Sequence, residues 1–408
     1  IELPSSGSNR RYFRVHFPSG SLIGASGTSI DENKAFIYLA DHFHESGLPV
    51  PKVLKVSDDF KYYIQEDLGD LLLFEAIERG RKSSVFNAEE TALLAKTIHL
   101  LPEIQYNGAK NLDYSYCYPQ PEFNERSILW DLNYFKYCFL KPTGLDFQEN
   151  LLEDDFMKMC NVLLQCESDT FLYRDFQSRN VMIKDGEPYF IDFQGGRRGP
   201  VYYDVASFLW QAKAAYPQDL KEHLLEVYMN SLSRYMPVNK ELFLKQLRHF
   251  VLFRILQVLG AYGYRGYFEK KPHFMQSVPF AIKNLYELLS EEFEEYPYLY
   301  KVLYELTQMK QFSDDIARQS LVIRVVSFAY KKGIPNDPSG NGGGFVFDCR
   351  AIDNPGKYER YRHFTGVDEP VIEFLKESGE IDVFLDKARE MVEPSVKRYI
   401  DRGFTNLM

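Results

Sequence analysis

Three polar residues in the middle of the chain, Asp175, Asn180 and Asp192, have the types and the spacing that phosphoryl transfer requires. Asp175 is followed by Asn180, and Asp192 comes after two short apolar runs that a Lys-Asp-Gly-Glu-Pro turn separates. Asp-Gly at the tip of such a turn is typical of a β-hairpin. The hairpin would bring the three side chains to one edge of a small sheet. There one Asp can accept the proton of an attacking hydroxyl, while the Asn and the other Asp hold magnesium over the phosphates of ATP.

Each of these residues taken alone has an ordinary structural explanation, because Asp and Asn often cap turns and end strands. A single Asp-x-x-x-x-Asn match would be weak evidence of function. The ordered set, with a hairpin between its second and third members, is a specific signal.

The stretch from Tyr173 to Phe193 resembles the catalytic and metal loops of the protein-kinase-like superfamily, especially the aminoglycoside and choline kinase branch, which phosphorylates small molecules. This resemblance implies an α+β protein-kinase-like two-lobe fold that uses ATP and Mg²⁺. It also implies that Asp175 is the catalytic base and that Asn180 and Asp192 hold the metal. Relatives usually have His where this chain has Tyr173, at a position that packs the loop.

The segment after the metal loop also resembles small-molecule kinases, because a short Gly- and Arg-rich loop leads into Gly199-Pro200 and Asp204-Val205-Ala206. The shortness of this loop favours a small acceptor over a protein chain. Asp204 stands at the start of a predicted helix, where a carboxylate can bind free N–H groups. We interpret Asp204 as a structural brace for the catalytic loop.

Residues 1–66 are predicted to form a small sheet-based lobe, and its first turn would lie over the ATP phosphates. Small residues allow close backbone approach there, so Ser8, Asn9 and Arg10 are the candidate phosphate-binding residues. The Lys that kinases place on their third strand is absent from the segment LIGASGTS. We therefore expect the phosphates to be held differently, and the helix that follows offers Glu32 for the nucleotide.

Residues 67–312 are predicted to form a helical lobe. At its junction with the sheet, backbone groups are expected to meet adenine, and Glu66 and Leu68 are the candidate contacts. The aromatic-rich helix SILWDLNYFKYCFL carries Asp131, which we expect on a solvated face rather than at a sugar.

A long helix in this lobe sets Arg254, Gln257 and Tyr264 among Leu, Val and Gly. It resembles the corresponding segment of bacterial anomeric kinases for N-acetylmuramate and N-acetylglucosamine, which implies that these three residues bind a sugar acceptor. An amphipathic helix with its polar residues in solvent is the alternative. The charged residues around this helix are mostly positive: Arg254, Arg265, Lys270 and Lys271, with Glu269 as the acidic residue. This positive charge suits a neutral or carboxylate-bearing sugar better than a polycationic aminoglycoside.

The pattern changes after a polar joint at residues 313–320, which we interpret as a linker. Residues 321–408 are predicted to form a small α/β domain, with strands at 321–330 and 345–350 and a helix near the end. They resemble the C-terminal domain of the RapZ RNase adaptor family. The matching motifs are Ser-Phe-Ala-Tyr at 327–330, Phe-Asp-Cys-Arg at 347–350, Asn-Pro at 354–355 and Thr-Gly-Val-Asp at 365–368.

The RapZ resemblance implies a domain that binds RNA. The local charge gives this little support, because residues 321–408 hold 13 Lys or Arg against 14 Asp or Glu. We expect the domain to be incomplete, since the Gly-Cys-Thr-Gly-Gly loop of that family does not occur in the sequence.

The composition limits the function classes. The 408 residues carry a formal net charge of −10, which argues against a protein that coats nucleic acid. Its five cysteines include no Cys-x-x-Cys pair, a pattern typical of a reduced, cytoplasmic protein rather than a metal or redox protein. No apolar run is long enough to span a membrane, and the sequence leaves the oligomeric state open.

The favoured function is therefore an ATP- and magnesium-dependent kinase of a sugar hydroxyl. The alternative is a regulatory adaptor or pseudokinase whose tail binds RNA or a protein partner. The absent strand Lys supports this alternative, whereas the intact set of Asp175, Asn180 and Asp192 opposes it.

Overall fold

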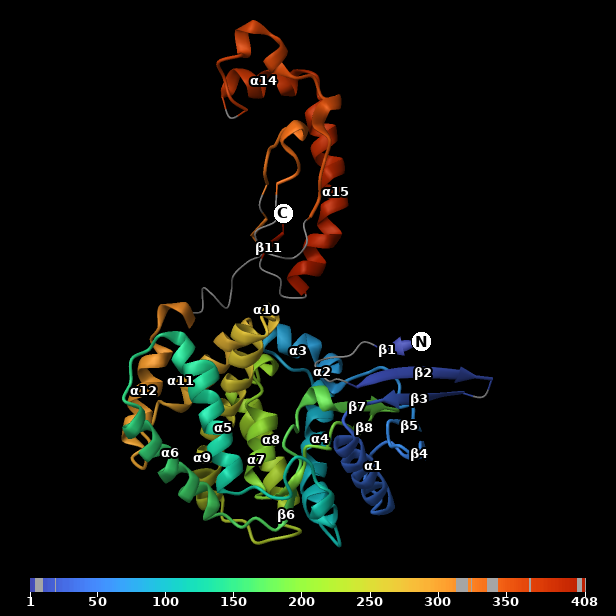
Figure 1. Cartoon of the computed structure of the whole chain (residues 1–408), viewed down its shortest axis with the longest axis vertical. Coiled ribbons are helices and arrows are strands. Elements are labelled where there is room, and N and C mark those ends of the chain that lie inside the picture. The colour runs from blue at the N-terminus through green and yellow to red at the C-terminus, as the bar shows by residue number, and fades with distance from the viewer. Residues whose placement is uncertain are drawn as a thin grey trace. The chain divides into compact units, whose positions relative to one another are not determined.

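The computed structural model describes residues 1–3, 10–18, 20–312, 322–323, 325–335, 344–366, 368–401 and 406–407. The chain forms two compact units, Ile1–Phe312 and Ser313–Met408 (Figure 1). The predicted linker at 313–320 and the candidate phosphate-binding residues Ser8 and Asn9 lie outside the described residues.

The first unit begins with a five-stranded antiparallel sheet whose strand order is β1-β2-β3-β5-β4. Helix α1 packs on this sheet, and the rings of Phe36 and Tyr63 stack with their centroids 5.1 Å apart. Apolar residues recur on α1 at helical spacing, which gives it one buried face. The elements are β1 (Glu2–Leu3), β2 (Arg11–Phe17), β3 (Gly20–Ser26), α1 (Ile30–Glu45), β4 (Val53–Val56) and β5 (Tyr62–Glu66).

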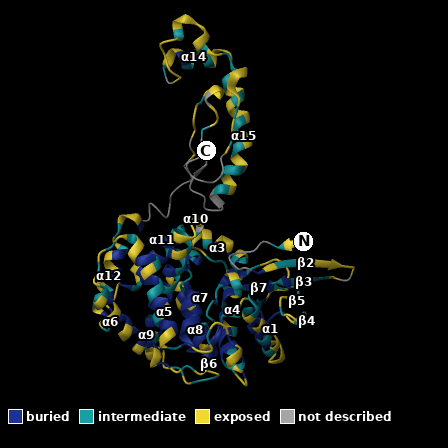
Figure 2. Cartoon of the chain, in the orientation of Figure 1, coloured by how far each residue is buried: buried dark blue, intermediate teal, exposed yellow. Residues whose placement is uncertain are grey.

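The rest of this unit is a helical lobe, and its central helices are the most buried part of the molecule (Figure 2). Helix α5 continues as a π-helical turn at Lys136–Leu140, and α9 continues as one at Tyr264–Phe268. The α-helices are α2 (Leu73–Ala76), α3 (Glu78–Ser83), α4 (Ala88–Asn107), α5 (Glu125–Phe135), α6 (Glu149–Leu164), α7 (Tyr202–Leu209), α8 (Gln218–Leu232), α9 (Lys240–Gly263), α10 (Pro272–Met275), α11 (Val278–Leu288) and α12 (Pro297–Thr307).

Helices α5 and α9 cross closely because two glycines face the crossing. A Cβ atom on Gly260 would lie 2.9 Å from the Phe135 backbone nitrogen, and one on Gly263 would overlap the Cys138 carbonyl. Only a residue without a side chain fits at such a distance. The close crossing fixes the depth at which the polar residues of α9 lie in the lobe.

Two small antiparallel sheets carry the loops of interest. Strand β6 (Thr170–Leu172) pairs with β9 (Arg197–Gly199), and β7 (Val181–Lys184) pairs with β8 (Glu187–Phe190). Asp185 and Gly186 at the tip of β7-β8 have φ angles of 54° and 78°, as a type I′ turn requires. The hairpin predicted from Asp-Gly is confirmed, and the catalytic loop connects β6 to β7.

The second unit contains α14 (Glu369–Glu377), α15 (Glu380–Asp401) and a parallel pair of two-residue strands, β10 (Val322–Ile323) and β11 (Asn406–Leu407). The strand predicted at 321–330 is present only as β10 among the described residues, and its Ile323 is 47% exposed rather than buried, while the strand predicted at 345–350 is wrong. Val325 is 92% exposed, and residues 345–348 have no regular structure. A β-prone run forms a long strand only where it can pair with another strand and pack against an apolar layer. Val371 is the one buried hydrophobic residue among the described residues of this unit, so such a layer is lacking there.

In the part of the chain that the structure describes, no helix is long and apolar enough to cross a membrane.

Candidate active site

Asp204 holds the start of the catalytic loop in place. Its carboxylate accepts hydrogen bonds from the backbone N–H groups of Tyr173 and Arg174, each at 2.9 Å. It lies fully buried in the first turn of α7, where the side-chain amide of Gln105 approaches to 3.4 Å. Burial raises the pKa of Asp204 to about 7, although the two N–H groups act in the opposite direction. The bracing role inferred from the sequence agrees with these contacts.

Tyr173, which stands where relatives usually have His, fills the space beneath the loop. Its ring is buried and meets the edges of Phe176, Phe190 and Phe193. Its hydroxyl donates to the Ile191 carbonyl. The tyrosine thus connects the catalytic loop to the strand end that precedes Asp192.

The structure brings Asp175, Asn180 and Asp192 together at the base of the hairpin. The Asn180 side-chain amide donates to the Asp175 carbonyl at 2.8 Å, and the Ile191 N–H donates to the Asn180 carbonyl at 3.0 Å. The enclosed surroundings of Asp192 and the nearby charge of Asp175 raise the pKa of Asp192. Asp192 also has a φ of 66°, a left-handed conformation that is uncommon for a non-glycine residue and often marks a functional site.

These residues fit a magnesium ion by their chemistry. The Asn180 nitrogen is used by the loop, which leaves its oxygen for a ligand, and Asp192 contributes a carboxylate. Oxygen donors suit Mg²⁺, which usually takes one or two protein carboxylates together with phosphate oxygens and water. No cluster of three or more His, Cys, Asp or Glu forms a metal site among the described residues, so this site would depend on the nucleotide for its other ligands.

Arg254, predicted to bind the acceptor, contacts the predicted base. From α9 its Nη2 donates to Asp175 Oδ1 at 3.1 Å, and its Nε donates to Ser207 Oγ at 3.1 Å. Its Nη1 donates to Gln257 Oε1. Arg254 is buried, and all three of its nitrogens are hydrogen-bonded within the protein. The side chain of Gln257 therefore accepts a hydrogen bond from Arg254.

Tyr264 lies further along, in the π-helical turn after α9. It is 40% exposed, and its ring centroid lies 5.7 Å from that of Tyr134 and 6.0 Å from that of Phe268. These contacts place Tyr264 in an aromatic cluster, without a recorded contact to Asp175. Of the three predicted acceptor residues, Arg254 contacts the base and Gln257 contacts Arg254.

The expectation that Asp131 lies on a solvated face is wrong. The residue is buried on α5, and its carboxylate lies 3.4 Å from Arg174 of the catalytic loop. Burial raises the pKa of Asp131, while the guanidinium groups of Arg174 and two further arginines oppose that rise. Helical spacing alone missed this contact because it comes from the catalytic loop, which is distant in sequence.

On the nucleotide side, Arg10 and Glu32 form an ion pair with 3.1 Å between Nη2 and Oε1. Arg10 is buried, and its Nε donates to Asn33 Oδ1 at 3.1 Å. The side-chain amide of Gln194 approaches Glu32 to 3.4 Å and donates to Asp192 at 2.7 Å. A continuous chain of polar contacts therefore connects Arg10 to the predicted metal ligand.

The hinge residues predicted to contact adenine already make some contacts within the protein. The Glu66 carboxylate accepts from Lys184 Nζ at 2.6 Å, and the Glu66 N–H donates to the Lys52 carbonyl at 2.9 Å. Leu68 is buried. Next to them, Arg14 donates twice to Asp67, at 2.7 and 3.0 Å. These hydrogen bonds hold the hinge in place, and they leave only some of its polar groups available to bind adenine.

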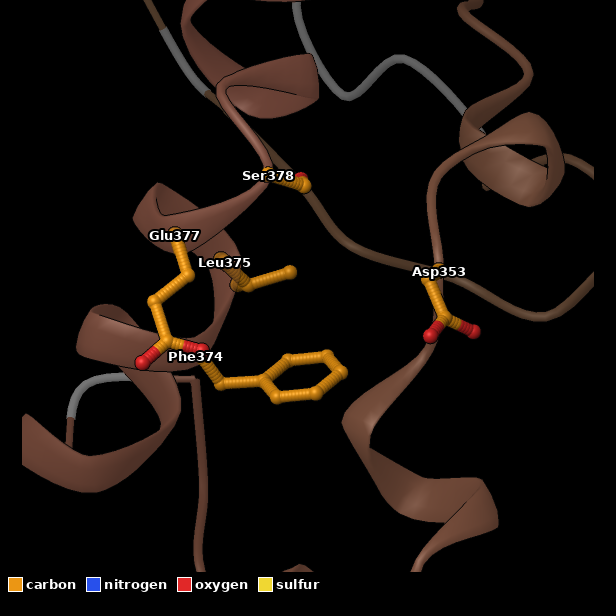
Figure 3. A pocket seen from close by; sticks show the side chains of 5 residues that line it. All are labelled: Asp353, Phe374, Leu375, Glu377 and Ser378. Atoms are coloured by element: carbon orange, nitrogen blue, oxygen red, sulfur yellow. The ribbon is translucent and has the colours of Figure 1, made fainter.

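The second unit has a hollow of about 300 Å³, lined by Asp353, Phe374, Leu375, Glu377 and Ser378 (Figure 3). Asp353 already binds Lys357 and Tyr358 at 3.1 and 3.0 Å. The lining residues include two carboxylates and no Lys or Arg, so the hollow does not suit an anionic ligand.

A two-lobe α+β fold, with the catalytic loop, hairpin and acidic strand end described above, defines a kinase-type phosphotransferase. Residues 1–241 match the model of the phosphotransferase enzyme family, and the chain belongs to that family. Residues 321–408 match the model of the RapZ C-terminal domain.

Similar proteins agree with this family. The chain is 25% identical over 305 residues to an N-acetylmuramate/N-acetylglucosamine kinase of Neisseria meningitidis, a match that covers 73% of this chain and 87% of the relative. It is 23% identical to the enzyme of the same name from Pseudomonas aeruginosa, over 68% of this chain and 80% of the relative. The solved structure of a choline/ethanolamine kinase family protein from Mesorhizobium loti has the same fold, with a TM-score of 0.50 and 11% identity over 75% of this chain and 92% of the other.

Proposed function

We propose that this protein transfers the γ-phosphate of ATP, with Mg²⁺, to a hydroxyl of an amino sugar such as N-acetylmuramate or N-acetylglucosamine. The observation that carries the proposal is the grouping of Asp175, Asn180 and Asp192 at one hairpin base. The names of the two bacterial relatives support the choice of acceptor.

In this reaction the sugar hydroxyl oxygen attacks the γ-phosphorus and a new P–O bond forms. The bond between the γ-phosphorus and the bridging oxygen breaks, and ADP leaves. Asp175 takes the hydroxyl proton, and Arg254 holds the Asp175 carboxylate in place for that transfer. When bound by Asn180 and Asp192, magnesium would neutralise charge on the phosphate oxygens.

Arg10 replaces the missing strand lysine in this proposal. Kinases pair that lysine with a helix glutamate, and here Arg10 makes the equivalent ion pair with Glu32 of α1. A guanidinium can contact two phosphate oxygens at once. The pair also weakens the pseudokinase alternative, because the absent lysine was the feature that favoured it. The alternative of a tail that binds RNA or a protein partner keeps the support of the match between residues 321–408 and the RapZ C-terminal domain.

The test is an ATP-consumption screen of the full chain over hexoses, N-acetylhexosamines, N-acetylmuramate, choline and aminoglycosides. We expect turnover with N-acetylmuramate or N-acetylglucosamine, with the anomeric hydroxyl as the acceptor. Rapid phosphorylation of an aminoglycoside, with no activity on either sugar, would contradict the proposal.

A further inference from the structure

Helix α7 supports Arg254 with a buried aromatic ring. Tyr203 lies in the first turn of α7, and the Arg254 guanidinium carbon lies over its ring, 5.6 Å from the centroid. A cation at this distance is attracted by the face of the ring, and the attraction is stronger where water is excluded. Both side chains are buried. The ring of Tyr203 therefore stabilises the guanidinium that contacts Asp175.

Two phenylalanines fix the Tyr203 ring in place. The ring centroids of Phe123 and Phe253 each lie 6.0 Å from that of Tyr203, with an interplanar angle of 63° in both pairs. Such edge-to-face contacts are a geometry that aromatic pairs prefer. All three residues are buried. The packed ring therefore gives Arg254 a rigid support.

Ser207 lies one helical turn after Tyr203 and binds the same guanidinium. Residues four apart on a helix are neighbours on its surface, and the Ser207 hydroxyl accepts a hydrogen bond from Arg254 Nε at 3.1 Å. Ser207 is buried, so water does not compete for this bond. The N–H groups of a guanidinium lie in its plane, whereas an aromatic ring stacks on its face. Tyr203 and Ser207 thus hold Arg254 by contacts of two complementary kinds.

The same helix also holds the backbone of the catalytic loop. Asp204 follows Tyr203 in the chain, and its carboxylate accepts from the N–H groups of Tyr173 and Arg174. Arg174 immediately precedes Asp175. Helix α7 therefore constrains the backbone next to the base through Asp204 and the side chain of the base through its contacts with the α9 arginine.

We propose that Tyr203 and Ser207 are positioning residues that hold the Arg254 guanidinium in place. The guanidinium in turn keeps the Asp175 carboxylate in the orientation that accepts the hydroxyl proton of the acceptor. This inference rests on the proposed kinase function and extends it from the base to the helix that supports the base. Loss of either support should lower kcat rather than raise KM, because the proton transfer depends on the orientation of the carboxylate and binding does not.

The experiment measures steady-state kinetics of the full chain with ATP and the sugar that it phosphorylates. Ser207→Ala should lower kcat by about 10-fold, the usual size of a lost hydrogen bond to a charged group, with little change in either KM. Tyr203→Leu should lower kcat to a similar extent, whereas Tyr203→Phe retains the ring and should retain kcat. Ser231→Ala is the matched control, because Ser231 of α8 is a buried serine that accepts from Arg234, at 2.6 Å, and this arginine does not belong to the proposed site.

Double variants separate positioning from a general loss of stability. In the Arg254→Met background, Ser207→Ala and Tyr203→Leu should lower kcat no further, because the guanidinium through which they act is already absent. A fall of the same size in that background would overturn the proposal, as would an unchanged kcat in both single variants. Equal losses in Tyr203→Phe and Tyr203→Leu would overturn the role of the ring. Urea unfolding establishes that each variant is folded, and Ser207→Ala decides the outcome if Tyr203→Leu does not fold.

If the wild type phosphorylates no sugar, the kinase proposal fails separately. Crystal structures of the wild type, Ser207→Ala and Tyr203→Leu then test the positioning alone. The contact between Arg254 Nη2 and Asp175 Oδ1, at 3.1 Å, should lengthen or break in the variants. A contact that is unchanged in both variants would overturn the inference.

Discussion

Arg254 Nη2 lies 3.1 Å from Asp175 Oδ1, so a residue of α9 holds the carboxylate that is expected to take the proton of the acceptor. The guanidinium is itself fixed by Ser207 and Gln257. A carboxylate held by a rigid partner keeps one orientation, which matters because small misplacements of a reacting group are costly. We therefore propose that Arg254 positions Asp175 rather than contacting the acceptor directly.

Asp175→Asn should lower kcat by about 10²-fold to 10⁴-fold, the usual cost of a lost general base. The amide cannot accept the hydroxyl proton, yet it keeps the size of the side chain. ATP binding, measured by calorimetry, should remain close to that of the wild type. Near-normal turnover in the variant would remove Asp175 from this role.

Arg254→Met should lower kcat by about 10-fold to 100-fold, since the Asp175 carboxylate loses its fixed orientation. The KM for the sugar should change much less than kcat. Steady-state kinetics over a range of sugar concentrations separate the two constants. A large rise in KM with kcat intact would instead return Arg254 to the acceptor-binding role that the sequence predicted.

The sequence was informative where the signal is local. The Asp-Gly hairpin, and the grouping of Asp175 and Asn180 around it, follow from residues close together in the chain. The contact between Arg10 and Glu32 and that between Asp131 and Arg174 were not predicted, because each joins elements that meet only in the folded lobe. Of the strands expected at 321–330 and 345–350, only β10 forms among the described residues, since β pairing depends on partners that local propensity does not reveal.

Asp192→Ala should abolish the magnesium-dependent part of nucleotide binding. The carboxylate lies beside Asn180 and is linked through Gln194 to Glu32, so its loss removes an oxygen ligand from the predicted metal site. Calorimetric titration with ATP, in the presence of magnesium and in the presence of a chelator, measures the effect. The wild type should show a difference between the two titrations and the variant should show none. Equal magnesium dependence in both proteins would count against the metal assignment.

Arg10→Gln should raise the KM for ATP by about 10-fold or more, because a charged contact to phosphate is lost. Glu32→Gln should have a smaller effect of the same sign, and the double variant should resemble Arg10→Gln, since the two residues act as a pair. Arg11→Gln is the matched control, because Arg11 is the next residue and pairs with Glu2 on the surface. Equal KM values for ATP in the Arg10 and Arg11 variants would mean that Arg10 does not contact the nucleotide.

The pKa of Asp204, which burial raises from 3.8 to about 7, predicts how stability depends on pH. A folded state that favours the protonated acid is stabilised by this group fully below pH 4, and the stabilisation is lost as the pH rises towards 7. Asp204→Asn retains one acceptor oxygen for the N–H groups of Tyr173 and Arg174 but does not titrate. The free energy of unfolding of the wild type, relative to this variant, should therefore decrease between pH 5 and 7, by at most about 1.4 kcal/mol per pH unit, and then level off. Urea unfolding of both proteins across pH 5 to 8 measures this difference. A difference that stays constant with pH would mean that Asp204 titrates near its ordinary pKa, and that its two N–H bonds outweigh the effect of burial.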